Sequence, residues 1–134
     1  MVPFKIRLNP GQPIVEQVFF AATRAILAGE LKPGEPFPSV RGLAAELRIH
    51  PNTAMKVVQQ LVQERWLISQ PGVGTVVATP PRPRAGQRRR LLADEIEKLV
   101  VEAMRVGMTA TELLEAVEEQ CRALQHLKSV SNDR

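Results

Sequence analysis

The sequence lacks the features that indicate a secreted or membrane-bound protein. Its 134 residues include one cysteine, Cys121, so no disulfide can form within the chain. Disulfides belong mainly to oxidising compartments, and we therefore expect a cytoplasmic protein. No run approaches the roughly 18 apolar residues that a membrane span needs. The sequence also lacks the basic start and following apolar stretch that indicate a signal peptide. We expect no membrane partner.

The motifs of catalysis and of cofactor binding are also missing. The sequence contains no Gly-rich phosphate loop, no His-Glu zinc motif and no Gly-x-Ser-x-Gly elbow. Carboxylates gather in residues 94–119, but their spacing is typical of an exposed helix face. Cys121 and His126 are five residues apart, and this spacing does not bring two side chains to one helix face. We therefore expect a protein that is not an enzyme and that holds no metal and no cofactor.

Charge is distributed unevenly along the chain. Residues 1–90 hold 13 Lys and Arg against 5 Asp and Glu, a net charge of +8. Residues 91–134 hold 5 against 9, a net charge of −4. The length suits one compact domain, or one small domain with an appendage. The basic part is therefore expected to meet a polyanion, and the acidic part to have a different role.

The beginning of the chain predicts an extended segment and two helices. Residues 4–8 alternate apolar and basic side chains, which is typical of extended backbone. Apolar residues then recur at spacings of three and four from Ile14 until Gly29, a suitable helix end. After a proline-rich loop, Ser39 can cap a second helix that runs to about Leu47.

A third helix and two β-type runs follow. Pro51 suits the first position of a helix that reaches about Glu64. Residues 66–69 and 75–78 are the β-type runs, and the glycine-containing loop between them predicts a hairpin. Three helices followed by a hairpin describe a winged helix-turn-helix. The predicted fold class is therefore mainly α with a small β-wing, and residues 1–78 form a DNA-binding domain.

Beyond this domain the composition changes twice. Residues 79–90 are rich in Pro and Arg, which predicts a basic linker; the run Arg88 to Arg90 is either solvated there or in contact with phosphates. Residues 91–134 predict a helical dimerisation segment with helices at 91–106 and 110–127. Their apolar stripes are expected to form the contact of a homodimer. The predicted dimerisation residues are Leu92, Ile96, Leu99, Val100, Leu113, Leu114, Val117, Cys121 and Leu124.

End signals separate the two tail helices. Thr109 and Glu112 have the spacing of a capping box, which marks the start of the second helix. Gly107 suits the end of the helix before it.

The third helix carries the residues that suit DNA recognition. In a helix-turn-helix, the N-terminal residues of this helix meet base edges in the major groove. His50, Asn52 and Thr53 are expected to be exposed there and can hydrogen-bond bases or phosphates, whereas Lys56 is a point charge suited to phosphate. Arg41 lies in the first turn of the second helix, where a cation is unfavourable unless an anion lies opposite.

Four motifs in order resemble the DNA-binding domain of the GntR family of transcription regulators, over about residues 12–78. They are Pro33-Gly34, the stretch Phe37 to Ala44, the stretch His50 to Thr53, and Gly72-Val73-Gly74-Thr75. The resemblance implies that the arginine of the second motif, the turn-to-helix residues and the wing glycines contact operator DNA. By position these are Arg41, His50, Asn52, Thr53, Lys56, Gly72 and Gly74, with Ser39 and Thr75 added. Ser39 and His50 can also serve only as helix caps, and the two glycines suit any hairpin.

Two positions depart from the family pattern. Gly42 stands where the family usually has an acidic residue, and Gln70-Pro71-Gly72 replaces a basic wing tip.

The length of the tail indicates the subfamily. Fifty-six residues follow Ala78, fewer than the effector domains of most subfamilies need. A tail of two helices resembles the YtrA-like subfamily, whose tail dimerises. A pocket of several hundred Å³ is hard to build from two helices alone.

The favoured hypothesis is a homodimer that binds double-stranded DNA at an inverted-repeat operator and acts as a repressor. One alternative is an architectural protein with the same fold, whose affinity would be nearly independent of DNA sequence. Another is a protein-interaction adaptor that no longer binds DNA. The sequence does not reveal whether a small molecule relieves DNA binding. If such an effector exists, a groove between the tail helices and the DNA-binding domain is the expected place for it.

Overall fold

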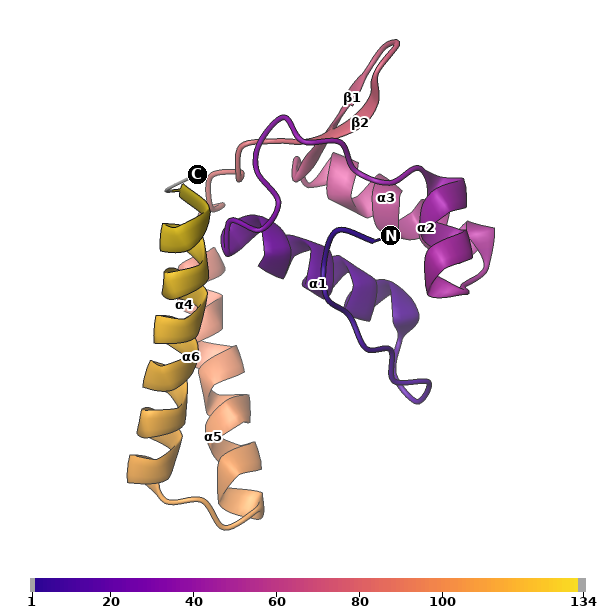
Figure 1. The fold of residues 1–134 in the computed structure, drawn as a ribbon. Helices are drawn as coiled ribbons and strands as arrows, with labels where there is room; N and C mark the ends of the chain where they lie inside the picture. The colour runs from indigo at the N-terminus through magenta and orange to yellow at the C-terminus, as the bar shows by residue number, and fades with distance from the viewer. Residues whose placement is uncertain (1, 133–134) are drawn as a thin grey trace. The chain divides into compact units, whose positions relative to one another are not determined.

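A computed structural model of the chain describes residues 2–132, with side chains as far as Leu127. The fold is mainly helical with one two-stranded antiparallel sheet, as predicted (Figure 1). Residues up to Pro81, together with the end of the chain from Leu127, belong to one compact unit, and residues 82–126 belong to another. Among the described residues, no helix is both long enough and apolar enough to cross a membrane.

Three helices of the first unit lie where the sequence predicts them. They are α1 (Ile14–Leu27), α2 (Val40–Leu47) and α3 (Pro51–Gln63). The end signals are also confirmed. Gly29 adopts a φ of +80° directly after Ala28, the C-cap of α1. Ser39 caps α2 by accepting a hydrogen bond from the N–H of Gly42.

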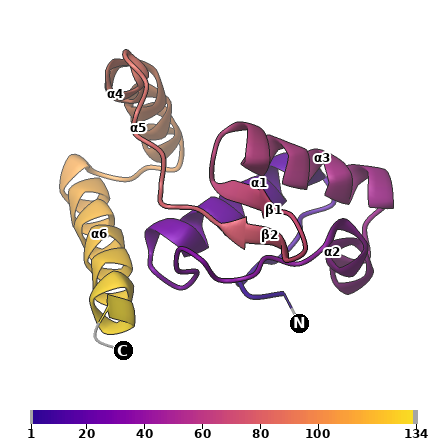
Figure 2. The ribbon, with the colours of Figure 1, turned by 90° about the horizontal axis from the view of Figure 1, so that it is seen from above.

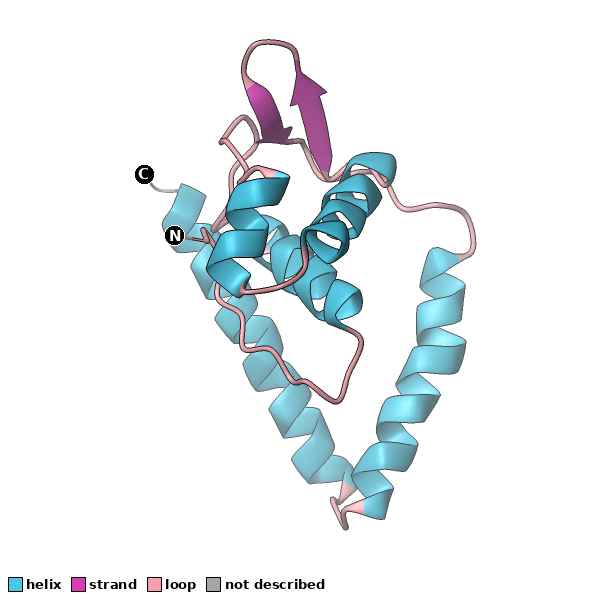
Figure 3. Cartoon of the chain, turned by 90° about the vertical axis from the view of Figure 1, so that its right-hand side faces the viewer, coloured by secondary structure: helices cyan, strands magenta, loops and turns pink. Residues whose placement is uncertain are grey.

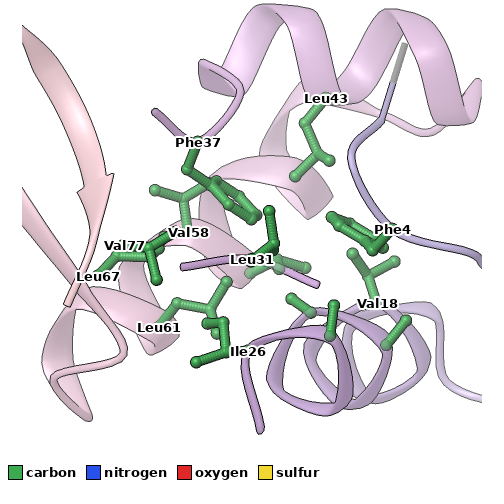
Figure 4. Close-up of a cluster of buried hydrophobic side chains, with 14 of the residues drawn as sticks. Phe4, Val18, Ile26, Leu31, Phe37, Leu43, Val58, Leu61, Leu67 and Val77 are labelled. Carbon is green, nitrogen blue, oxygen red and sulfur yellow. The ribbon is translucent and has the colours of Figure 1, made fainter. Parts of the chain in front are cut away.

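The core of the first unit is formed by the apolar stripes of these helices (Figure 4). Val18, Ala22 and Ala25 of α1 are at most 1% exposed, and they share the core with the buried stripe of α3. Phe4 and Phe37, from two different loops, stack with ring centroids 5.9 Å apart. Burial of such side chains is worth about 1.5–3 kcal/mol each, so this core explains why α1–α3 fold together.

The N-terminal segment shows the alternation expected of extended backbone, although it forms no strand. Phe4 is buried and Ile6 half-buried, whereas Lys5 and Arg7 are exposed. Gln17 of α1 holds the end of this segment in place. Its Oε1 accepts from the N–H of Asn9 at 2.7 Å, and its Nε2 donates to the carbonyl of Asn9 at 2.9 Å.

The predicted hairpin consists of β1 (Leu67–Gln70) and β2 (Gly74–Val77), paired antiparallel with Leu67 opposite Val77 and Gln70 opposite Gly74. The strand bounds differ from the prediction by one residue. The proline-rich loop before α2 runs along β2, because the N–H of Phe37 donates to the carbonyl of Thr75 at 2.8 Å. These two strands form the sheet of the described residues. Figure 2 shows the hairpin from above, with α1, α2 and α3 around it.

The second unit begins its helix earlier than the sequence predicts. Residues Gln87–Arg90 form α4, which continues through the π-helical turn η1 (Leu91–Glu95) into α5 (Ile96–Arg105). The last four residues of the linker predicted at 79–90 are therefore helical. Gly86, with a φ of +86°, precedes the helix, and the arginines after it are good helix formers.

The last helix, α6 (Ala110–Asn132), is longer than the predicted 110–127. Its start is as predicted. The N–H of Thr109 donates to Oε1 of Glu112 at 3.0 Å, and the N–H of Glu112 donates to Oγ1 of Thr109 at 3.2 Å. Gly107, with a φ of +79°, ends the preceding helix.

The apolar stripes of α5 and α6 remain largely uncovered. The two helices diverge from the turn that joins them (Figure 3). Leu92 is 67% exposed and Leu114 is 63% exposed. Leu113 and Leu124 are half-buried, whereas Cys121 is exposed.

Candidate nucleic-acid interface

A tight turn joins α2 to α3 and sets the direction in which α3 leaves. Arg48, directly after α2, adopts the left-handed conformation, with a φ of 55° and a ψ of 48°. The N–H groups of Arg48 and Ile49 both donate to the carbonyl of Ala44. His50 then caps α3, because its Nδ1 accepts from the N–H of Asn52 at 3.0 Å. A helix, a short hydrogen-bonded turn and a second helix are the reading unit of DNA-binding domains.

One face of α3 is buried and the opposite face is polar and exposed. The buried stripe is Ala54, Val57, Val58 and Leu61. Asn52, Lys56, Gln59 and Gln63 are exposed at spacings of three and four, which places them on one face of the helix. Amide side chains hydrogen-bond base edges, and an ammonium group attracts phosphate. This outer face of α3 therefore has the chemistry of a surface that reads DNA.

The starts of α2 and α3 are both open to an anion. Neither helix has an acidic residue in its first turn. The positive ends of the two helix dipoles are therefore not neutralised by a neighbouring carboxylate. Arg41 lies exposed in the first turn of α2. A cation at this position is unfavourable for the isolated helix and is compensated when a phosphate lies opposite.

The structure places most of the predicted DNA-contacting residues at the surface. Ser39, Arg41, His50, Asn52, Lys56, Gly72 and Gly74 are exposed. The expectation that Thr53 is exposed is wrong in part, since its side chain is half-buried. It is turned about 100° around α3 from Asn52, toward a recess that Leu8 and Ile14 also line. Thr75 is half-buried as well, and it lies in β2 where the loop before α2 runs along this strand.

The hairpin is a wing without charge. Residues 67–77 include no Lys, Arg, Asp or Glu. Gly72 and Gly74 have φ values of +78° and +108°, and a Cβ at either position would meet no atom within 4 Å. The glycines thus permit the positive φ values that the turn requires, and the space around them is open. Any contact of this wing tip with DNA depends on backbone groups and on uncharged side chains such as Gln70.

Sequence reasoning missed two exposed residues of α3. Gln59 lies one turn after Lys56 on the outer face, and Met55, which is 45% exposed, lies at its edge. The sequence does contain a signal for this face, because the polar residues at positions 52, 56, 59 and 63 follow the helical repeat. A prediction restricted to the first turn of the helix does not include Gln59.

Part of the basic charge of the first unit lies away from the outer face of α3. A groove of about 490 Å³ is lined by residues that include Lys5, Arg7, Gln17 and Arg24. Gln17 and Arg24 lie on the side of α1 turned away from the core, and the core lies between α1 and α3. These cations therefore gather around α1 and the N-terminal segment and are not on the outer face of α3. The three arginines of α4, Arg88 to Arg90, are exposed in the second unit.

Three helices around one core, a hydrogen-bonded turn before α3 and an uncharged hairpin define a winged helix-turn-helix of the DNA-binding class. The chain belongs to the GntR family: the model described as "Bacterial regulatory proteins, gntR family" matches residues 7–77. Members of this family are transcription regulators. The protein is therefore a DNA-binding transcription regulator and not an enzyme.

Individual relatives agree with the YtrA-like resemblance. The chain is 27% identical over 117 residues to the HTH-type transcriptional repressor YtrA of Bacillus subtilis (strain 168), covering 85% of this chain and 90% of that one. It is similar to the structure of YtrA from Sulfolobus acidocaldarius, a GntR-family transcription factor, with a TM-score of 0.50, 28% identity, and 89% and 97% of the two chains covered. A transcriptional antiterminator from Listeria monocytogenes EGD-e shares the fold, with a TM-score of 0.74, 22% identity, and 91% and 92% covered.

Proposed function

We propose that the protein is a sequence-specific repressor that binds an inverted-repeat operator as a homodimer. The observation that carries this proposal is the outer face of α3, where Asn52, Lys56 and Gln59 are exposed side by side. A major groove about 12 Å wide admits one helix, and amide side chains distinguish base pairs there. The reading surface belongs to a domain whose family regulates transcription.

Each proposed contact has a separate role. Asn52 reads a base edge, since an amide pairs with adenine in a bidentate manner. Lys56 and Arg41 bind phosphates on the two sides of the groove. Ser39 and His50 cap their helices, and their remaining polar atoms are available to the DNA backbone. At the wing, Gly72 and Gly74 allow the main chain to approach a sugar-phosphate surface closely. Thr53 and Thr75 are secondary contacts because they are half-buried.

The tail supplies the second half of the proposal. Residues 1–78 act as the DNA-binding domain, residues 79–90 as the basic connection, and residues 91–134 as the dimerisation segment. The apolar side chains of α5 and α6 are exposed along a stripe in one chain. A row of exposed large apolar side chains commonly marks an interface. Two copies that bury these stripes against each other would present two α3 helices to half-sites about one helical turn apart.

Repression is the simplest mode of control that the proposed dimer allows. A dimer bound across a promoter blocks polymerase without any further module. The related YtrA of Bacillus subtilis is named a repressor, which supports the same direction of control here. Because the protein acts on chromosomal DNA in a bacterial-type regulator family, we propose that it works in the cytoplasm.

Selection of binding sites from random duplex DNA tests this function. The selected sequences are titrated with the full chain at two salt concentrations. We expect enrichment of an inverted repeat, bound with a Kd at least about 10³-fold lower than that of unrelated DNA. Binding that is sensitive to salt but shows no enrichment would contradict sequence-specific repression and favour an architectural protein.

A further inference from the structure

Two arginines with left-handed backbone lie beyond the two ends of α3. Arg48, two residues before the cap of α3, has a φ of 55°, and Arg65, two residues after its end, has a φ of 67°. They are the residues other than glycine with positive φ in the described part of the chain. This conformation brings Cβ too close to the following carbonyl, and glycine avoids the cost. A fold with arginine at this position is therefore less stable than one with the glycine that a helix end usually has.

The surroundings of Arg48 point to a ligand outside the chain. Its side chain is exposed, and among the described residues no carboxylate forms an ion pair with it. Arg48 lines the same recess as His50 and Thr53, at the start of α3. Hydrogen bonds to Ala44 hold its backbone in place. The local fold thus holds the backbone of an exposed arginine beside the first turn of the recognition helix, and no carboxylate among the described residues pairs with its side chain.

We infer that Arg48 binds a phosphate of the DNA backbone at the edge of the groove that α3 enters. In a helix-turn-helix, the helix before the recognition helix crosses the backbone, and Arg48 is located where these two helices meet. A guanidinium group suits phosphate because its donors can bind two oxygens at once. A phosphate contact carries no base information, so Arg48 raises the affinity for every duplex and sets the position of α3.

Arg65 provides a matched comparison within the same chain. It has the same side chain and the same backbone conformation, and it is also exposed. It lies at the opposite end of α3, about 20 Å away along a helix of 13 residues. This position is at the base of the hairpin, away from the first turn of α3. We therefore assign the phosphate contact to Arg48 and not to Arg65.

Arg48→Gly separates the two effects of this residue, because glycine relieves the backbone and removes the cation. This inference depends on the proposed docking of α3, so the wild-type chain is measured beside each variant. Binding to the selected operator and to an unrelated duplex is followed by fluorescence anisotropy over a range of salt, and Tm by circular dichroism. We expect Arg48→Gly to raise Tm by about 2–8 °C. We also expect it to weaken binding to both duplexes about tenfold and to reduce the salt slope by about one per bound protomer.

Two further variants complete the test. Arg65→Gly should raise Tm in the same way and leave the Kd and the salt slope unchanged, whereas Arg48→Lys should retain most of the salt slope. Wild-type affinity and slope in Arg48→Gly, or an equal loss of affinity in Arg65→Gly, would overturn the assignment while the DNA-binding function stands. If Arg48→Gly does not raise Tm, the claim that the left-handed backbone of Arg48 destabilises the fold is overturned. A wild-type chain that binds no duplex at low salt would overturn the function and the inference together.

Discussion

The backbone N–H of Asn52 donates to Nδ1 of His50 at 3.0 Å, so the ring of His50 is the cap of α3. A neutral ring that accepts at Nδ1 carries its hydrogen on Nε2, which is then a donor. The same exposed side chain can therefore stabilise the helix through one nitrogen and meet DNA through the other. Capping and DNA binding are coupled at this residue, and substitution can separate them.

His50→Ser should keep the cap and remove the outer donor, since a serine hydroxyl caps helices well. We expect a Tm close to that of the wild type and a weaker affinity for the operator. His50→Ala removes both functions and should also lower the free energy of unfolding by about 1 kcal/mol. Thermal unfolding and operator titration of the two variants check this. Equal operator affinity in His50→Ser and the wild type would show that His50 is a cap alone.

Asn52 and Lys56 share one face of α3 but should respond differently to removal. Asn52→Ala should reduce operator affinity by about 1–3 kcal/mol and leave binding to unrelated DNA nearly unchanged, because it removes a base contact. Lys56→Ala should weaken binding to both duplexes and lower the salt slope by about one per protomer. Titrations of both DNAs at several salt concentrations distinguish the two. A uniform loss in Asn52→Ala would assign that residue to phosphate.

Val100 and Val101 allow a test of the dimer with the same residue type. Both are exposed, at 38% and 48%. Val100 belongs to the stripe with Ile96 and Leu99, whereas Val101 is turned about 100° away from Val100. Val100→Glu should convert dimers to monomers, because a buried unpaired carboxylate is costly. Val101→Glu should leave the dimer intact.

Size-exclusion chromatography with light scattering measures the mass in each case. Operator affinity should fall with the loss of the dimer, since two linked half-site contacts become one. A wild-type chain that is monomeric at all concentrations would contradict the proposed interface, as would dissociation caused equally by both variants.

Acidification should weaken the start of α6 through Glu112. Hydrogen bonds with the backbone and then the side chain of Thr109 hold the pKa of Glu112 below its ordinary value of 4.5. A carboxyl whose pKa is depressed in the folded state stabilises that state above pH 4.5, and the contribution is lost as the pH falls through the folded pKa.

Glu112→Gln keeps a capping side chain without the charge. Its Tm should lie below that of the wild type at pH 7, and the difference should shrink as the pH falls below about 4.5. Glu115→Gln, on the same helix and outside the capping box, is the control. A Tm difference between the wild type and Glu112→Gln that stays constant from pH 7 to about pH 3 would exclude a role for the ionised carboxylate.

Much of this protein follows from local sequence alone. Ser39, Pro51, Thr109 and Glu112 mark helix starts because capping depends on neighbouring atoms. The buried stripe of α3 follows from the helical repeat, and the winged helix-turn-helix follows from the order of these elements. The motifs around Arg41 and His50 identify the family for the same reason, since their spacing is a property of the chain. These features need no knowledge of distant contacts.

Other features are decided only by tertiary structure. Thr53 reads as an exposed first-turn residue, yet it is half-buried because the N-terminal segment and α1 pack beside the start of α3. The left-handed backbone of Arg48 cannot be read from its identity, since arginine ordinarily avoids that conformation. It results from the two hydrogen bonds to Ala44 and from the packing of α2 against α3. The physical reason is the same in both cases: long-range packing selects conformations and faces that local preferences leave open.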